Sequence, residues 1–212
     1  QPGLSNDVVS NLIEDAQHNL WITTEGGGLN YYNRETGTYT YYQHQPGDPG
    51  SIGSNLVKLV YEDADHNIWA GTHGGGLNVM AKGTGHFRRY FYDPQNPDSY
   101  LREITSLMED DQGHFWIGTN AGLHIMRRKG ASLYPLEDSA LTGQAAHLSI
   151  RYLFQDSRGR CWVGATKGLY LRDGGPMKRM LTSYINAIQE DSRGNIWVSL
   201  YYGGLMQFSP DL

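Results

Sequence analysis

The sequence has 212 residues, of which 39% are apolar and 12% aromatic, enough to bury a core. Its formal net charge of -5 argues against nucleic-acid binding as the main role, because such binding needs a basic face that neutralises phosphates. No run of 18 apolar residues is present, so we predict no direct membrane insertion for this segment.

The start of the chain predicts four short β-strands. Apolar or aromatic runs occupy residues 8–14, 20–24, 29–33 and 38–42, and polar or glycine-rich turns separate them. Short runs divided by turn residues are typical of antiparallel strands. The pattern then recurs, with runs at residues 56–62, 68–72, 77–81 and 86–92.

A regular signature shows that the whole chain is an internal repeat. Each of the five tryptophans lies six residues after an aspartate and seven or eight residues before the leucine of a Gly-Leu pair. Successive tryptophans are 48, 47, 46 and 35 residues apart, the length of one supersecondary unit that needs its neighbours. The motif residues are Asp15 and Trp21, Asp63 and Trp69, Asp110 and Trp116, Asp156 and Trp162, and Asp191 and Trp197.

We therefore predict an all-β fold, a β-propeller with five blade motifs of four antiparallel strands. The blade units are expected near 4–48, 52–98, 101–145, 149–180 and 181–212, in a single propeller region over 1–212. No sustained 3.6-residue apolar stripe is present, which disfavours a helical solenoid. The fifth unit ends after its third strand, near Phe208. The chain is then either an arc of a larger propeller, which we favour, or a five-bladed ring.

The repeated residues have expected structural roles. Each aspartate is predicted to accept backbone N–H groups within its own tight turn. Each tryptophan is predicted to wedge between adjacent blades, with its indole N–H needing a partner. Residues 63–67 look like the start of a calcium loop but lack its later ligands, so we predict a turn, no metal and no cofactor. The single cysteine, Cys161, is predicted to be a buried thiol.

The repeats also resemble a known family. The strings EDAQHNLWITTEGGGLNY, EDADHNIWAGTHGGGLNV, EDDQGHFWIGTNAGLHI, QDSRGRCWVGATKGLY and EDSRGNIWVSLYYGGLM are similar to the two-component regulator propeller repeat. They cover most of the chain, although the glycine-rich turn after the threonine differs in the fourth and fifth copies.

The resemblance implies a function. That family forms the extracytoplasmic sensor of hybrid two-component systems, best known from gut Bacteroidetes that sense glycans. It implies a periplasmic sensor of an oligosaccharide or its breakdown product, with a membrane helix and histidine kinase elsewhere in the parent protein, and with dimerisation as an additional expectation.

The expected ligand contacts lie where the repeats differ. In a four-stranded blade, the turn between strands two and three lies on the same face as the connection to the next blade, and propellers usually meet their ligands there. Variable residues on a constant frame suit recognition. The candidates in these turns are Glu25, His73, Asn120, Lys167, Tyr201 and Tyr202, with Arg102 in a connection.

Two alternatives remain at the level of sequence. Glu25 and His73 fall in neighbouring repeats and would form an acid-base pair in a streptogramin-lyase-like propeller enzyme. A protein-binding scaffold would instead use exposed blade edges. No metal-type histidine spacing or Gly-x-Ser-x-Gly motif is present, so we predict no catalytic residues and no enzyme activity.

Overall fold

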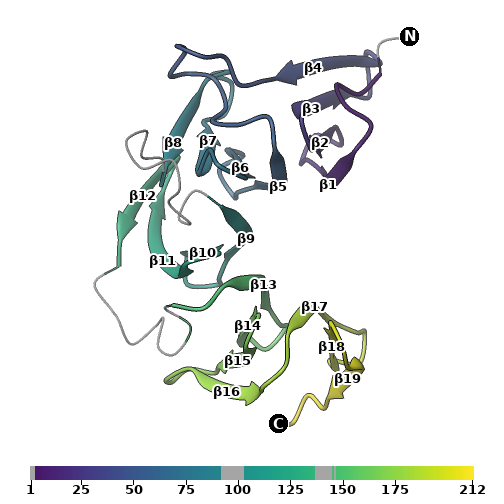
Figure 1. Ribbon diagram of the computed structural model, residues 1–212, viewed down its shortest axis with the longest axis vertical. Helices are drawn as coiled ribbons and strands as arrows, with labels where there is room; N and C mark the ends of the chain where they lie inside the picture. The colour runs from purple at the N-terminus through teal and green to yellow at the C-terminus, as the bar shows by residue number, and fades with distance from the viewer. Residues whose placement is uncertain (1–2, 92–102, 137–144, 146) are drawn as a thin grey trace. The chain divides into compact units, whose positions relative to one another are not determined.

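The computed structural model describes residues 3–91, 103–136, 145 and 147–212. The described residues form five antiparallel sheets, in each of which strands adjacent in sequence are hydrogen-bonded neighbours (Figure 1). The chain divides into two units, Gln1–Ile104 and Thr105–Leu212. Within the described ranges, no helix is long and apolar enough to cross a membrane.

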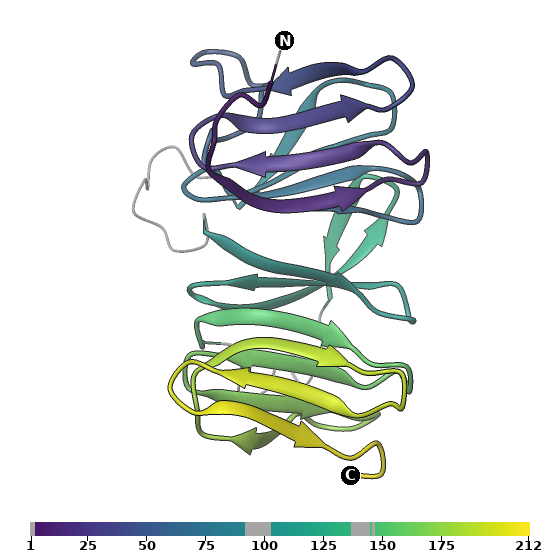
Figure 2. The ribbon, with the colours of Figure 1, turned by 90° about the vertical axis from the view of Figure 1, so that its right-hand side faces the viewer.

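The first unit contains two four-stranded sheets, and Figure 2 shows the first of them in purple to blue. Each is a meander of short strands, as the alternating runs and turns predict. In order, the strands are β1 (Val9–Glu14), β2 (Leu20–Thr24), β3 (Gly28–Asn33), β4 (Thr38–Tyr42), β5 (Val57–Glu62), β6 (Ile68–Thr72), β7 (Leu77–Met80) and β8 (Phe87–Tyr90).

The second unit contains the other three sheets, the last of which has three strands among the described residues. The third strand of this last sheet ends at Phe208. The strands are β9 (Ile104–Glu109), which begins at the last residue of the first unit, β10 (His114–Thr119), β11 (Gly122–Lys129), β12 (Ser132–Pro135), β13 (Ile150–Gln155), β14 (Cys161–Ala165), β15 (Gly168–Arg172), β16 (Lys178–Leu181), β17 (Ile185–Glu190), β18 (Ile196–Leu200) and β19 (Gly204–Phe208).

Tryptophan side chains fill the seams between successive sheets within each unit. Trp21 of the first sheet packs in one cluster with Val57, Val60 and Ile68 of the second sheet. In the second unit, Trp162 packs with residues of β17 and β18. Burial of these large apolar rings stabilises the packing of neighbouring sheets. A four-stranded sheet gains stability from such packing that it lacks on its own.

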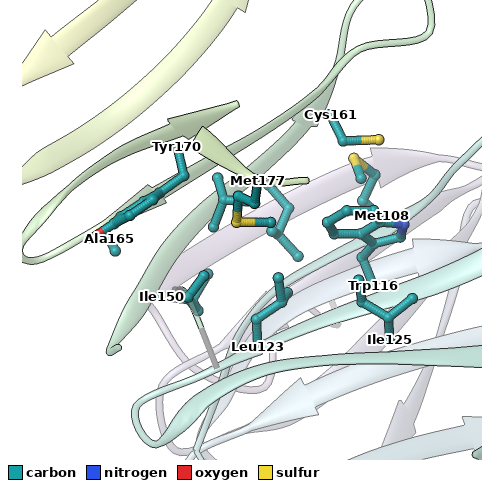
Figure 3. Packing of buried hydrophobic residues seen from close by; sticks show 12 residues of the cluster. Met108, Trp116, Leu123, Ile125, Ile150, Cys161, Ala165, Tyr170 and Met177 are labelled. Carbon is teal, nitrogen blue, oxygen red and sulfur yellow. The ribbon is translucent and has the colours of Figure 1, made fainter. Parts of the chain in front are cut away.

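The seam between the third and fourth sheets has the same construction. Trp116 is fully buried among Leu123, Ile150 and Cys161, and Figure 3 shows these side chains in one cluster. Cys161 is 2% exposed, which confirms the buried thiol. Burial raises the pKa of this thiol to about 12, so it stays protonated and unreactive at neutral pH.

In every sheet, the repeated aspartate lies in the turn between the first and second strands and links this turn to the tryptophan; we call this arrangement the clamp. One carboxylate oxygen accepts the backbone N–H groups two and four residues later, as in the bonds of 2.9 Å each from Asp65 and Asn67 to Asp63. The other oxygen accepts the indole N–H of the tryptophan. These Nε1–Oδ2 distances are 3.1 Å for Trp21, 2.7 Å for Trp69, 2.8 Å for Trp116, 2.8 Å for Trp162 and 2.9 Å for Trp197.

The glycine of the Gly-Leu pair allows close strand approach. Gly28 has φ +81°, and a Cβ atom there would lie 2.3 Å from the carbonyl oxygen of Tyr42 on β4. Gly76 has the same relation to the carbonyl oxygen of Tyr90. Only glycine fits these two positions, whereas at Gly204 in the fifth sheet the φ of +75° alone favours glycine.

Candidate ligand-binding face

The turns between the second and third strands carry six of the predicted ligand contacts. Backbone hydrogen bonds tie these turns to the residues that precede first strands. His73 N–H donates to the Leu56 carbonyl at 2.9 Å, and Tyr201 N–H donates to the Tyr184 carbonyl at 3.0 Å. Glu25 forms an isolated bridge with Leu56 of the next sheet. The turns and connections therefore lie together, as the repeat alignment predicts.

A β-bulge shapes this face in both units. The pairing of first and second strands shifts register between Val57 and Leu59 and between Ile150 and Tyr152. The residues inside these shifts are Lys58 and Arg151. Because a bulge redirects its extra side chain, both cations can be presented at this end of the strand.

In the first unit, the predicted contacts are engaged in ion pairs. Lys58 Nζ lies 2.7 Å from Glu25 Oε1, and both side chains are well exposed. His73 Nδ1 lies 3.3 Å from Glu103 Oε1. Each pair joins a turn of one sheet to a residue at or before the first strand of the next. Arg102, the remaining candidate, lies outside the described residues.

Glu25 and His73 thus each have another partner. The acid-base pair considered for a lyase has no structural support, because Glu25 pairs with Lys58 and His73 with Glu103. Among the residues that the structure describes, no group of histidine, cysteine, aspartate or glutamate side chains could hold a metal ion.

Asn120, in the second unit, has a similar connecting contact. Ser149 Oγ lies 3.0 Å from Asn120 Oδ1 and donates a hydrogen bond to it. Ser149 immediately precedes β13 of the next sheet. Three of the variable turn residues, Glu25, His73 and Asn120, therefore contact residues outside their own sheet.

The second unit also has a cluster of tyrosines, whose side chains contact one another through their rings. The ring centroids of Tyr184 and Tyr201 are 5.0 Å apart, and those of Tyr201 and Tyr202 are 4.4 Å apart. Tyr201 is 54% exposed and Tyr202 is 92% exposed, so most of the Tyr202 ring is accessible to solvent. Large aromatic side chains this exposed often mark a binding surface.

Two cations accompany the tyrosine cluster. The guanidinium carbon of Arg151, the bulged residue, lies 5.9 Å from the Tyr184 ring centroid. Lys167 is exposed in the equivalent turn of the preceding sheet. Tyr184 and Arg151 were not among the residues predicted from the sequence. Tyr184 could have been found from its place just before a first strand, whereas no residue signal announces the bulge at Arg151.

Comparison with known proteins finds a family model that matches three segments of the chain. The sequence profile described as "Two component regulator propeller" matches residues 3–26, 102–121 and 180–202. Three segments of the chain are thus similar to the two-component regulator propeller repeat. None of the curated proteins matches it in sequence.

Solved structures similar to these propeller repeats include two from B. thetaiotaomicron. The extracellular domain assigned to the hybrid two component system BT3049 is 24% identical with a TM-score of 0.79, over 99% of this chain and 28% of that one. The corresponding domain of BT4673 is 23% identical with a TM-score of 0.71, over 98% of this chain and 29% of that one.

A third similar structure supports the fold from a different kind of protein. The β-propeller domain of Cps50 (Swd1) from Myceliophteria thermophila is 12% identical, with a TM-score of 0.64 over 96% of this chain and 70% of that one. These similarities establish the β-propeller fold. The repeats span under a third of the length of the two B. thetaiotaomicron chains.

Proposed function

We propose that this chain is part of the extracytoplasmic sensor region of a hybrid two-component regulator. The matched repeats and the likeness to extracellular domains of such systems support this role. In this proposal the chain lies in the periplasm, and the remainder of the parent protein supplies the membrane helix and the histidine kinase. The propeller itself binds and does not catalyse.

The proposed ligand is an oligosaccharide or its breakdown product. The exposed tyrosine cluster carries this part of the proposal, because Tyr201 and Tyr202 offer rigid aromatic faces at low entropic cost. Sugar rings have apolar faces that can stack on such rings, while their hydroxyl groups can bond to Lys167 and to the phenol groups. Tyr184 packs against Tyr201, and Tyr201 packs against Tyr202.

Glycan-array screening followed by calorimetric titration of the best hit tests this function. Tyr202→Ala should weaken binding about tenfold, since exposed aromatic anchors commonly contribute 1–2 kcal/mol or more. Tyr134→Ala is the matched control, because Tyr134 is 51% exposed on β12 of the same unit. Equal affinity of the two variants would exclude the tyrosine cluster as the site.

The same assay separates the competing functions. A sensor should bind the glycan and leave it unchanged on prolonged incubation, whereas a lyase would convert it. A scaffold would ignore all sugars and retain a protein partner. Absence of glycan binding, or turnover of the bound glycan, would contradict the proposal.

A further inference from the structure

The first unit contains a cleft of its own. It occupies the seam between the first and second sheets, at the end where strands one and two and strands three and four are joined. Its volume is about 340 Å³, within the usual range for small-molecule sites. Trp21, Tyr31 and Tyr42 form one wall, and Ile68 and Met80 form the other.

One residue of the aromatic wall, Tyr31, distinguishes this seam from the others. Across the second and third strands, the tryptophan of the first sheet lies opposite Tyr31. In the second, third and fourth sheets the equivalent residue is Val79, Ile125 or Leu171. In the fifth sheet it is Gln207. A position that is aliphatic in three sheets is thus a tyrosine in this cleft, where the Trp21 and Tyr31 ring centroids are 4.6 Å apart.

Both cleft tyrosines are half-buried and remain hydrogen-bond donors. Burial raises the pKa of Tyr31 and of Tyr42 above the ordinary value, so both phenols are protonated at neutral pH. Trp21 and Tyr42 lie with their ring planes 26° apart, in a stacked arrangement. The wall therefore offers flat apolar faces with polar tips.

The rim has one cation without a carboxylate partner. In the first sheet, Arg34 at the start of the turn between strands three and four pairs with Glu14 at 2.8 Å. Lys82 holds the equivalent place in the second sheet. There, Glu62 Oε1 lies 2.8 Å from His66 Nδ1, and Glu62 Oε2 accepts a hydrogen bond of 2.8 Å from the Ala16 N–H. Among the described residues, no ion pair involves Lys82.

We propose that this cleft binds an acidic monosaccharide unit, a hexuronate. The sugar ring would lie against Tyr31 and Tyr42, and its carboxylate would pair with Lys82, while Gln17 and Thr84 at the rim would contact hydroxyl groups. Two carboxylates, Asp15 and Glu62, also line the cleft. Asp15 accepts the Asn19 backbone N–H and the Trp21 indole N–H, and Glu62 accepts the Ala16 N–H and pairs with His66. Because both carboxylates have partners of their own, Lys82 is left to pair with the charge of the ligand.

An adjoining pocket extends the cleft along the seam. Its volume is about 210 Å³, and it shares Tyr42 and Gly85 with the larger cleft. His86 and Phe87 line its far side. A second sugar residue attached to the uronate would lie there, and because Asp48 also lines this pocket, that residue should be a neutral sugar.

Calorimetric titration of the 212-residue chain with D-galacturonate, D-glucuronate, D-glucose and benzoate tests the proposal. One or both uronates should bind at least about tenfold more tightly than glucose, as one charge-assisted contact allows. Absence of uronate binding at tens of millimolar would overturn the proposal. So would tighter binding of benzoate, since it would indicate a site for aromatic acids.

Two variants locate the site. Lys82→Ala should abolish the preference for uronate over glucose, and Lys178→Ala, which removes an exposed cation from β16, should not. Tyr31→Val should weaken both sugars while preserving the fold, because Val79 occupies the equivalent position in the second sheet. If Lys82→Ala and Lys178→Ala behave alike, the cleft is not the site.

This site is independent of the glycan site proposed on the second unit. Tyr202→Ala should leave uronate binding to the cleft unchanged, and Lys82→Ala should leave glycan binding at the tyrosine cluster unchanged. Loss of uronate binding in Tyr202→Ala would place that ligand at the tyrosine cluster and overturn the cleft assignment.

Discussion

At the scale of single residues, the aspartate of each repeat organises more than its own turn. Its carboxylate accepts two backbone N–H groups and the indole N–H of the tryptophan that fills the seam. In the second sheet, Asn67 Nδ2 adds a further bond of 2.9 Å to Asp63 Oδ2. Turn closure and seam packing therefore depend on one side chain.

Replacing Asp63 by alanine should lower the free energy of unfolding by about 2–4 kcal/mol, because it leaves buried N–H groups without acceptors. Asp63→Asn keeps one acceptor oxygen and should cost less. Chemical denaturation measures both, with Glu35→Ala, an exposed carboxylate of the same unit, as the control. The clamp would be refuted by an Asp63→Ala protein as stable as Glu35→Ala.

The sequence predicted half of this clamp. The turn residues 63–67 indicated an aspartate that accepts backbone N–H groups, and the indole was expected to need a partner. The link between the two was not evident, because a separation of six residues does not state which way either side chain points. The hairpin register, which sets Tyr61 opposite Trp69, brings the ring beside the carboxylate.

At the scale of strands and sheets, the runs of apolar and aromatic residues located the strands well. The expected run 8–14 corresponds to Val9–Glu14, and the expected run 86–92 contains Phe87–Tyr90. The bulges in the first strands were not predictable. Their residues, which include Ser10, Lys58 and Arg151, share no chemical type, so the bulge follows from sheet geometry.

A second glycine, two residues after the tryptophan, sets the distance between sheets. A Cβ atom on Gly164 would lie 2.6 Å from Ile185 Cγ2 of the next sheet, and one on Gly118 would lie 2.7 Å from Ile150 Cγ2. In the first sheet this place is taken by Thr23, whose hydroxyl lies 3.1 Å from that of Ser10. The small residue lets the first strand of the following sheet pack closely.

Gly164→Ala should therefore destabilise the protein by about 1–3 kcal/mol through overpacking of the seam. Gly175→Ala is the matched control, because its added methyl group would meet only the Asp173 carbonyl oxygen, at 3.8 Å. Thermal and urea unfolding of the two variants makes the comparison. Equal stability would mean that the seam can accept an extra methyl group without cost.

At the scale of the whole molecule, stability and recognition are assigned to different residues. Tryptophan and aspartate recur in every repeat, and Trp69, Trp116 and Trp162 are fully buried. The variable residues lie on exposed or half-exposed turns. Their positions were predictable from the repeat alignment, but their partners were not, because contacts such as Glu25 with Lys58 join residues far apart in sequence.

This division predicts a large effect on melting for a scaffold residue and a small effect for turn residues. Trp69→Ala removes a side chain that is 0% exposed. It should lower the free energy of unfolding by about 3–5 kcal/mol and the melting temperature by roughly 10 °C. The double change of His73 and Lys167 to alanine should leave melting within roughly 2 °C of the parent, since it removes two exposed side chains and one surface ion pair. It should nevertheless weaken glycan binding, because Lys167 is proposed to bond to the sugar hydroxyl groups. Scanning calorimetry with and without glycan measures both properties. A large drop in melting temperature for the double variant would show that the turns carry the scaffold as well as recognition.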